Sequence, residues 1–234
     1  MERMSYQDVV VGAVCWILTV EYFVGQVVAQ AAWKTPYSLL DNPVSDLGNT
    51  ACRQWPPAAA GSQLAERLGA GGGFVCSPLH SLMNVSFVAA GILLVLGLGL
   101  TRRVWPKRQL ATWGFVLLAL AGMGKIVVGL APENSSLLLH ELGGLGIPLS
   151  CFGVLLMGLA VWQSRRRLAV FSVSLASVGL LGLLGWIVSV FIRHGHGAAE
   201  RIAAYPVFVW MLVLGISFLL AARSGIHPRS TLAA

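Results

Sequence analysis

The chain has 234 residues, of which 56% are hydrophobic and only 11% are charged, and its formal net charge is +7. Soluble globular domains have roughly a quarter of their residues charged, so this composition excludes that class and indicates a membrane protein. The mean hydropathy of +0.77 agrees. A transmembrane β-barrel is also excluded, because the sequence lacks alternating apolar runs of about ten residues.

Apolar windows of about 20 residues, the length of helix that crosses a ~30 Å hydrocarbon core, define the predicted spans. They cover residues 9–33, 82–100, 110–131, 137–162, 168–192 and 203–222, with a long first loop over residues 34–81. We predict an all-α polytopic transmembrane bundle of six helices in a single domain, residues 1–234. The first window contains the triplet AQA, which resembles a signal-peptide cleavage site. Its apolar stretch exceeds the roughly 7–15 residues of a signal core, so we expect a spanning helix there.

Basic residues predict the orientation, because short cytoplasmic loops are enriched in Lys and Arg. The basic residues of the loops after the second and fourth windows are Arg102, Arg103, Lys107, Arg108, Arg165, Arg166 and Arg167. Both loops are expected to face the cytoplasm, which places both termini there and the long first loop outside. We expect a multi-pass protein of the cell inner (plasma) membrane. Its basic clusters would meet anionic headgroups, so the expected partners are membrane lipids and no nucleic acid.

The cysteine positions agree with this orientation. Cys52 and Cys76 lie in the first outer loop, where an oxidising compartment permits a disulfide, whereas Cys15 and Cys151 lie inside predicted helices. We predict a bridge between Cys52 and Cys76, and the alternative is two free thiols. The Ala-, Gly- and Pro-rich segment between them predicts a flexible excursion with a short helical turn around residues 64–68.

Two ionisable residues, Glu21 and Lys125, fall inside predicted spans. An ionised side chain at the bilayer centre costs about 2.5–3.5 kcal/mol, so each needs a partner, a changed protonation state or water. One solution is that they pair with each other. Alternatively, Lys125 snorkels to the nearby interface and Glu21 makes a structural hydrogen bond between helices.

Further polar side chains gather at the outer ends of the predicted helices. His80 and Asn84 share one helix face because they lie four residues apart. His140 shares a face with Gly144 in the segment LLLHELGGLGIP, whose glycines allow close approach of a neighbouring helix. Glu141 points in a different direction, so we expect His140 to face the common pocket.

Four segments carry a family resemblance. They are NPVSDLG at 42–48, SPLHSLMNVSF at 77–87, GKIVVGLAPENSSLLLHELGG at 124–144 and ERIAAYPVFVW at 200–210. Together they resemble the domain-of-unknown-function family nine-nine-eight of prokaryotic six-span membrane proteins, over most of the chain. A weaker similarity to the DRAM/Frag/Sfk group implies a role in lipid and membrane homeostasis. The resemblance supports the six-span fold and marks Ser45, Asp46, Asn84 and His140 as motif positions.

The segment NPVSDLG predicts an extended Asn-Pro followed by a turn or short helix start, with Ser45 or Asp46 as a cap. Backbone that re-enters the membrane surface has to be satisfied by protein or water, so we expect this segment to fold over the helix ends as a lid. Ser45 and Asp46 would then lie above His80 and His140. Alternatively, Asp46 only caps a short interfacial helix and pairs with His140.

The first functional hypothesis is a metal-assisted hydrolase of a membrane lipid. Asp46, His80 and His140 would bind a metal such as zinc, whose bound water attacks the lipid, and Ser45 would orient that water. The predicted catalytic residues are Ser45, Asp46 and His140. Glu141 or Glu200 would carry a proton, and His194 or His196 could supply a further ligand.

The other hypotheses use the same outward-facing polar pocket. In a small transporter or proton-coupled carrier, Glu21 and Lys125 would lie on the solute or proton path. Haem ligation by His80 and His140 is a third hypothesis, and a structural or sensory role without catalysis is a fourth. The predicted substrate-binding residues are Glu21, Asn84, Lys125, Glu141 and Arg201. The sequence therefore favours a lipid-handling membrane protein and leaves its chemistry open.

Overall fold

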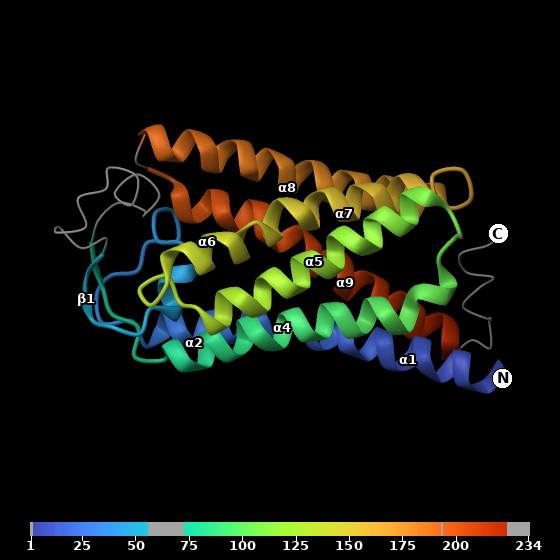
Figure 1. Cartoon of the computed structure of the whole chain (residues 1–234), viewed down its shortest axis with the longest axis horizontal. Coiled ribbons are helices and arrows are strands. Elements are labelled where there is room, and N and C mark those ends of the chain that lie inside the picture. Colours follow the sequence, from blue (N-terminus) through green and yellow to red (C-terminus); the bar gives the residue numbers. More distant parts are fainter. Residues whose placement is uncertain (1, 56–72, 193, 224–234) are drawn as a thin grey trace.

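The computed structural model describes residues 2–55, 73–192 and 194–223, and it contains six helical spans long and apolar enough to cross a membrane (Figure 1). They cover Tyr6–Ala31, His80–Val104, Gln109–Leu130, Leu137–Ala160, Arg166–Ile192 and His196–Arg223. The predicted all-α bundle of six spans is confirmed. The sixth span begins at His196 and not at the predicted residue 203, because the helix continues through Glu200 and the buried Arg201.

Two of the spans are each broken into two helices. The first comprises α1 (Glu2–Leu18) and α2 (Glu21–Ala31), and the fourth comprises α6 (Leu137–Gly144) and α7 (Gly146–Ala160). The other spans are built on α4 (His80–Thr101), α5 (Gln109–Leu130), α8 (Arg166–Ile192) and α9 (His196–Arg223). In the fourth span, Pro148 has no N–H for the carbonyl of Gly144, which explains why regular helix is interrupted at Leu145.

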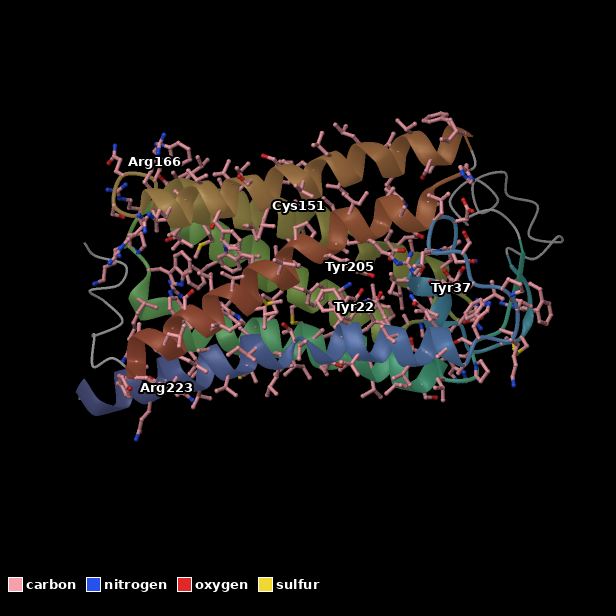
Figure 2. All side chains as sticks on the ribbon, turned by 180° about the vertical axis from the view of Figure 1, so that it is seen from behind. Tyr22, Tyr37, Cys151, Arg166, Tyr205 and Arg223 are labelled. Carbon is pink, nitrogen blue, oxygen red and sulfur yellow. A yellow bond between two sulfur atoms is a disulfide. The ribbon has the colours of Figure 1, made fainter. Side chains whose placement is uncertain are left out.

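The six spans pack as a ring in chain order. Each packs on the next, and α9 closes the ring against α1. The start of α1, the end of α9 and the α4–α5 and α7–α8 connections lie at one end of the bundle, which we call the terminal end (Figure 1). Figure 2 shows Arg166 and Arg223 at this end and Tyr37 at the other. We call that other end, with residues 32–55, 73–79, 131–136 and 194–195, the loop end.

Aromatic side chains fill the ring in its terminal half. The ring centroids of Trp16 and Trp210 lie 5.5 Å apart, and Trp105 lies 5.8 Å from Trp210. Trp16 and Trp210 have no exposed surface. This packing closes the bundle near the terminal end and confines the site described below to its loop half and middle.

Glycines bring α5 close to both of its neighbours. An added Cβ at Gly91 of α4 would meet the carbonyl of Gly122, and one at Gly124 would meet the carbonyl of Gly143 in α6. Small residues let helix backbones approach one another in a membrane, where packing drives association. These contacts make α4, α5 and α6 a single wall of the site.

The long first loop contains an antiparallel hairpin of β1 (Arg53–Trp55) and β2 (Gly73–Val75), with Arg53 opposite Val75. The predicted disulfide between Cys52 and Cys76 is confirmed, and it joins the residue before β1 to the residue after β2. Cys15 and Cys151 are free thiols buried in the bundle. The helical turn predicted around residues 64–68 lies outside the described residues.

Candidate functional site

Residues 42–49 form a lid across the loop end of the ring. Its centre is the short 3-10 helix η1 (Ser45–Gly48). Side chains within and just before the second span hold one edge of the lid: Asn84 Nδ2 donates to the carbonyl of Gly48 at 2.9 Å, and Ser77 Oγ donates to the carbonyl of Leu47 at 2.7 Å. An added Cβ at Gly48 would overlap the Asn84 side chain, so a larger residue here would displace the side chain that holds the lid. The lid backbone is therefore satisfied by protein groups on this side.

Two consecutive residues of α9 hold the other edge of the lid. The Glu200 carboxylate accepts the N–H of Val44 at 2.7 Å. Arg201 donates through Nη1 to the carbonyl of Asn42 at 2.8 Å and through Nη2 to the Tyr37 hydroxyl at 2.6 Å. Arg201 is only 8% exposed. Its Nη1 and Nη2 are thus used to hold the protein's own loop, and Arg201, predicted to bind substrate, does not line the cavity described below.

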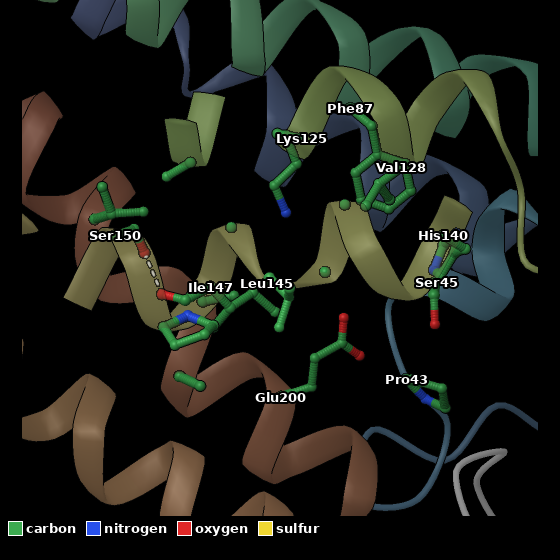
Figure 3. Close-up of a pocket in the computed structure, with 18 of the residues that line it drawn as sticks. Pro43, Ser45, Phe87, Lys125, Val128, His140, Leu145, Ile147, Ser150 and Glu200 are labelled. Atoms are coloured by element: carbon green, nitrogen blue, oxygen red, sulfur yellow. Dashed lines mark hydrogen bonds between the residues drawn. The ribbon is translucent and has the colours of Figure 1, made fainter. Parts of the chain in front are cut away.

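A cavity of about 170 Å³ lies beneath the lid, lined by α4, α5, α6, α7 and α9, with α8 at one side (Figure 3). That volume admits on the order of ten water molecules. The ionisable and hydroxyl-bearing groups nearest the loop end are Ser45, Asp46, Lys125, Glu133, His140, Glu141, His196 and Glu200. Along α9 the lining runs from His196 to Met211, a rise of about 20 Å. The cavity therefore extends from the lid to the middle of the span.

The deeper part of the lining is mainly apolar. It includes Leu94 of α4, Ala121 of α5 and Val207, Phe208 and Met211 of α9. The cavity thus has a polar end beneath the lid and a mainly apolar end in the bundle interior.

The cavity also reaches the side of the bundle where the fourth span is broken. Leu145 lines the cavity and is 54% exposed. Gly144 lines it too, and a Cβ added at Gly144 would meet no atom of the described chain within 4 Å. Both residues belong to the fourth candidate span, Leu137–Ala160, so the cavity borders an exposed part of the bundle side within that span.

Lys125 and Glu200 project into the cavity from opposite walls (Figure 3). The Lys125 ammonium lies 5.2 Å from the ring centroids of both Tyr22 and Phe87 and 5.8 Å from that of Phe208. Among the residues that the structure describes, Lys125 makes no hydrogen bond or ion pair. Aromatic faces stabilise a cation by about 0.5–2 kcal/mol, but they supply no counter-charge. The cavity therefore contains a lysine that lacks an anionic partner within the described chain.

Asp46 and Glu133 form a buried carboxyl pair between the lid and the α5–α6 connection. Asn42 Nδ2 donates to Asp46 and Asn49 Nδ2 donates to Glu133, each at 3.1 Å. Burial raises the pKa of Asp46 to about 6. Burial, reinforced by the negative charge of Asp46, raises the pKa of Glu133 well above its ordinary value. Glu133 consequently keeps its proton and donates it to the Asp46 carboxylate.

His140 is held in one tautomer at the cavity wall. Its Nδ1 lies 3.0 Å from the carbonyl oxygen of Ala131, and since a carbonyl only accepts, Nδ1 carries the proton. Nε2 is left with a lone pair on a residue that lines the cavity. Ser45 lines the same cavity, and its hydroxyl makes no hydrogen bond to the described chain. His140 can therefore accept a proton or a hydrogen bond from a ligand.

The structure does not bring His80 into this cavity. His80 is the first residue of α4, and its Nδ1 bonds to the carbonyl of Ser77 at 2.9 Å, whereas the lining contributed by α4 begins deeper, at Phe87. The predicted metal site of Asp46, His80 and His140 is therefore not assembled, and no three His, Cys, Asp or Glu side chains in the described ranges are grouped to hold a metal. Haem ligation by His80 and His140 stays a prediction, of which the cavity contains only His140.

The other predicted substrate-binding residues divide into two groups. Lys125 and Glu141 line the cavity, whereas Glu21, Asn84 and Arg201 do not. Asn84 is used to hold the lid. Glu21 lies where the first span is broken, with its carboxyl beside Ser86 of α4 and not paired with Lys125.

The two histidines beside Gly195 are engaged within the protein. His196 lines the cavity, but Trp186 Nε1 donates to its Nε2 at 2.6 Å and its Nδ1 lies 2.9 Å from Ser189 Oγ. His194 contacts Asp41 at 2.8 Å on the surface. Neither is positioned as a ligand for a group in the cavity.

Sequence reasoning does not single out Glu133, one half of the carboxyl pair. It lies in the polar segment APENSS, which is typical of an exposed loop. The one signal is that this segment contains no basic residue, so a carboxyl there has no neighbour in the sequence with which to pair.

The carboxyl pair predicts a pH dependence. The pKa of Asp46 is raised from 3.8 to about 6, so the protein's stability is greatest below pH 3.8 as far as this group is concerned, and this contribution is lost as the pH rises through about 6. We expect Asp46→Asn to reduce the fall in thermal stability over this range, by up to about 3 kcal/mol in unfolding free energy. Thermal unfolding in detergent at a series of pH values measures it.

Asp41 provides the matched control on the same loop. The N–H of Gly195 bonds to its carboxylate and lowers its pKa, so its contribution has the opposite sign and is lost as the pH falls. Asp41→Asn should leave the fall between pH 3.8 and about 6 in place. An identical pH profile for Asp46→Asn and the unmodified protein would contradict this account of the pair.

Comparison with known proteins places the chain in a family. The model of the family DUF998, described as a protein of unknown function, matches residues 10–217, a range that includes the lid and the whole cavity lining. No curated protein and no solved structure matches the chain. With its six apolar spans, the chain is an integral membrane protein that belongs to the DUF998 family.

Proposed function

We propose that this protein binds a membrane lipid, with the head group beneath the lid and an acyl chain in the deeper part of the cavity. The observation that carries the proposal is the division of one cavity into a polar end, with Lys125 and Glu200, and a mainly apolar end that reaches Met211. A lipid has the same division. A small polar solute would leave the apolar end without a partner.

The side opening supports entry of the ligand from the bilayer. Leu145 lines the cavity and is more than half exposed. Leu183 and Trp186 of α8 also line the cavity. An apolar opening at membrane depth admits an acyl chain without exposing it to water. Burying that chain contributes about 0.8 kcal/mol for each CH₂ moved out of water, but little when it moves out of lipid, so the polar end has to supply selectivity.

Lys125 is the group at the polar end that a ligand would stabilise. A lysine ammonium within a span is costly when no anion or water accepts from it. Because the described chain supplies three aromatic rings and no anion, an anionic head group would complete this site. Glu200, on the opposite wall, keeps the site selective against ligands that carry negative charge alone.

We further propose that the loop end faces the outside of the plasma membrane. Cys52 and Cys76 are bridged at this end, as an oxidising compartment allows, and the basic residues Arg103 and Arg108 belong to the connection at the terminal end. In this orientation the lid and the head-group end of the cavity belong to the outer half of the membrane.

Reporter fusions test the orientation. A fluorescent protein that matures only in the cytoplasm should be fluorescent when fused after Ala234, and alkaline phosphatase, which requires an oxidising compartment, should be inactive there. A non-fluorescent fusion together with an active phosphatase fusion would overturn the proposed orientation. The proposal that the cavity binds a lipid would not be affected.

A substitution at the side opening tests lipid binding. Gly144→Phe adds a ring at a lining position where a Cβ meets no atom within 4 Å, so it should lower the amount of lipid that co-purifies with the protein by about tenfold, equal to 1.4 kcal/mol. Extraction and mass spectrometry of protein purified in mild detergent measure it. The matched control is Gly99→Phe, since an added Cβ at Gly99 also meets nothing within 4 Å and Gly99 is not part of the lining. Equal lipid content in both variants would contradict the proposal.

Hydrolysis of the bound lipid is a second candidate function, favoured by the free Nε2 of His140 at the cavity wall. His140 would take a proton from an attacking water, and a general base of this kind contributes about 10²–10⁴-fold in rate. If this function is correct, the purified protein in lipid vesicles releases cleaved lipid, and His140→Gln stops the release but retains bound lipid. Absence of any cleaved product from the unmodified protein would exclude hydrolysis and leave the binding function intact.

A further inference from the structure

We infer that the lipid's head group is zwitterionic, with an anionic group that contacts Lys125 and a protonated primary amine that contacts Glu200. This inference rests on the proposed lipid-binding function and adds the chemical class of the ligand. The two side chains approach the cavity from opposite walls, Lys125 from α5 and Glu200 from α9 (Figure 3).

The anionic group is required by the surroundings of Lys125. The three aromatic rings around its ammonium are hydrocarbon faces that cannot accept a conventional hydrogen bond, and no carboxylate of the described chain lies within ion-pair distance of it. The ammonium has three donors. A phosphate oxygen in the cavity would accept from it at the point where the chain offers no acceptor.

The amine is inferred from Glu200, which has one carboxylate oxygen without a hydrogen bond to the described chain. One oxygen, Oε2, is occupied by the N–H of Val44 at 2.7 Å. The other makes no hydrogen bond to the described chain, and Glu200 lines the cavity. This oxygen therefore faces the ligand space as an unused acceptor.

The neighbouring Arg201 does not neutralise Glu200 by direct contact. Its Nη1 donates to the carbonyls of Leu39, Asn42 and Gly197 at 3.2, 2.8 and 2.8 Å, and its Nη2 donates to the Tyr37 hydroxyl. The structure gives no ion pair between Arg201 and Glu200 in the described ranges. The second oxygen of Glu200 thus remains available for a cation from the ligand.

The charges of the whole lining favour a zwitterion over an anion. Asp46, Glu133, Glu141 and Glu200 supply four carboxyl groups, of which Glu133 holds its proton, against the single ammonium of Lys125. A head group with negative charge alone would pair with Lys125 and leave Glu200 opposed by like charge. A quaternary ammonium would supply positive charge but no N–H for the carboxylate. A primary amine supplies both, so it is the group that fits.

Three lipids with the same acyl chains test the inference: phosphatidylethanolamine, phosphatidylglycerol and phosphatidylcholine. Each is added to the delipidated full-length protein, and binding is measured by native mass spectrometry. The ethanolamine lipid should bind at least about tenfold more tightly than the other two, as a charge-assisted hydrogen bond predicts. Glu200→Gln can still accept the N–H of Val44 but loses the charge, so it should reduce this preference to near unity. Lys125→Met keeps an apolar side chain among the rings and should weaken binding of all three phosphate-bearing lipids.

The outcomes separate this inference from the function on which it rests. Equal binding of the three lipids, a preference for phosphatidylglycerol, or an ethanolamine preference that survives in Glu200→Gln would overturn the zwitterion and leave lipid binding standing. If none of the three binds the unmodified protein better than it binds Gly144→Phe, the lipid-binding function itself fails.

Discussion

The lid can lie over a cavity at the mouth of a membrane bundle only if its backbone polar groups find partners in the protein. An unsatisfied N–H or C=O in a water-poor site costs about 1–3 kcal/mol, and several occur in any eight-residue loop. The chain meets this constraint with side chains from two helices on opposite sides of the ring, Asn84 from α4 and Glu200 and Arg201 from α9. The charged side chains of Glu200 and Arg201 in α9 therefore have a structural role, which is to hold the lid.

The unpaired charges of the cavity follow from that arrangement. Arg201 is the cation nearest to Glu200 in the sequence, but its Nη1 and Nη2 donate to backbone carbonyls and to Tyr37, and Glu200 is not neutralised by contact. Lys125 makes no ion pair with Glu200 within the described residues, and its ammonium is surrounded by aromatic rings. Two opposite charges thus face a shared space without touching, an arrangement that is favourable when a dipolar group lies between them.

The sequence predicts the fold better than the site for identifiable physical reasons. Apolar length determines the six spans, and two cysteines on one long loop determine the disulfide. His140 is predicted to face the pocket because its helix periodicity places it with Gly144. The same argument wrongly places His80 in the pocket. Helix periodicity predicts the direction of a side chain but not whether the cavity extends to its level, and α4 lines the cavity only from Phe87 onward. The roles of Glu133 and Arg201 depend on contacts with the first loop, which is distant from both in the sequence, so no local sequence pattern predicts these roles.

Glu200 both holds the lid and lines the cavity, because only one of its two oxygens is used by the lid. One holds Val44 of the lid, and the other faces the ligand space. Asp46, two residues after Val44, is paired with Glu133, which also lines the cavity, so carboxyl groups from α9 and from the α5–α6 connection both hold the lid. A ligand amine that draws on Glu200 would alter the strength of the hydrogen bond to Val44, and a change in the lid would alter the affinity for the amine by the same free energy. If the proposed amine binds there, this one carboxylate would link ligand binding to the hydrogen bond that holds Val44 of the lid.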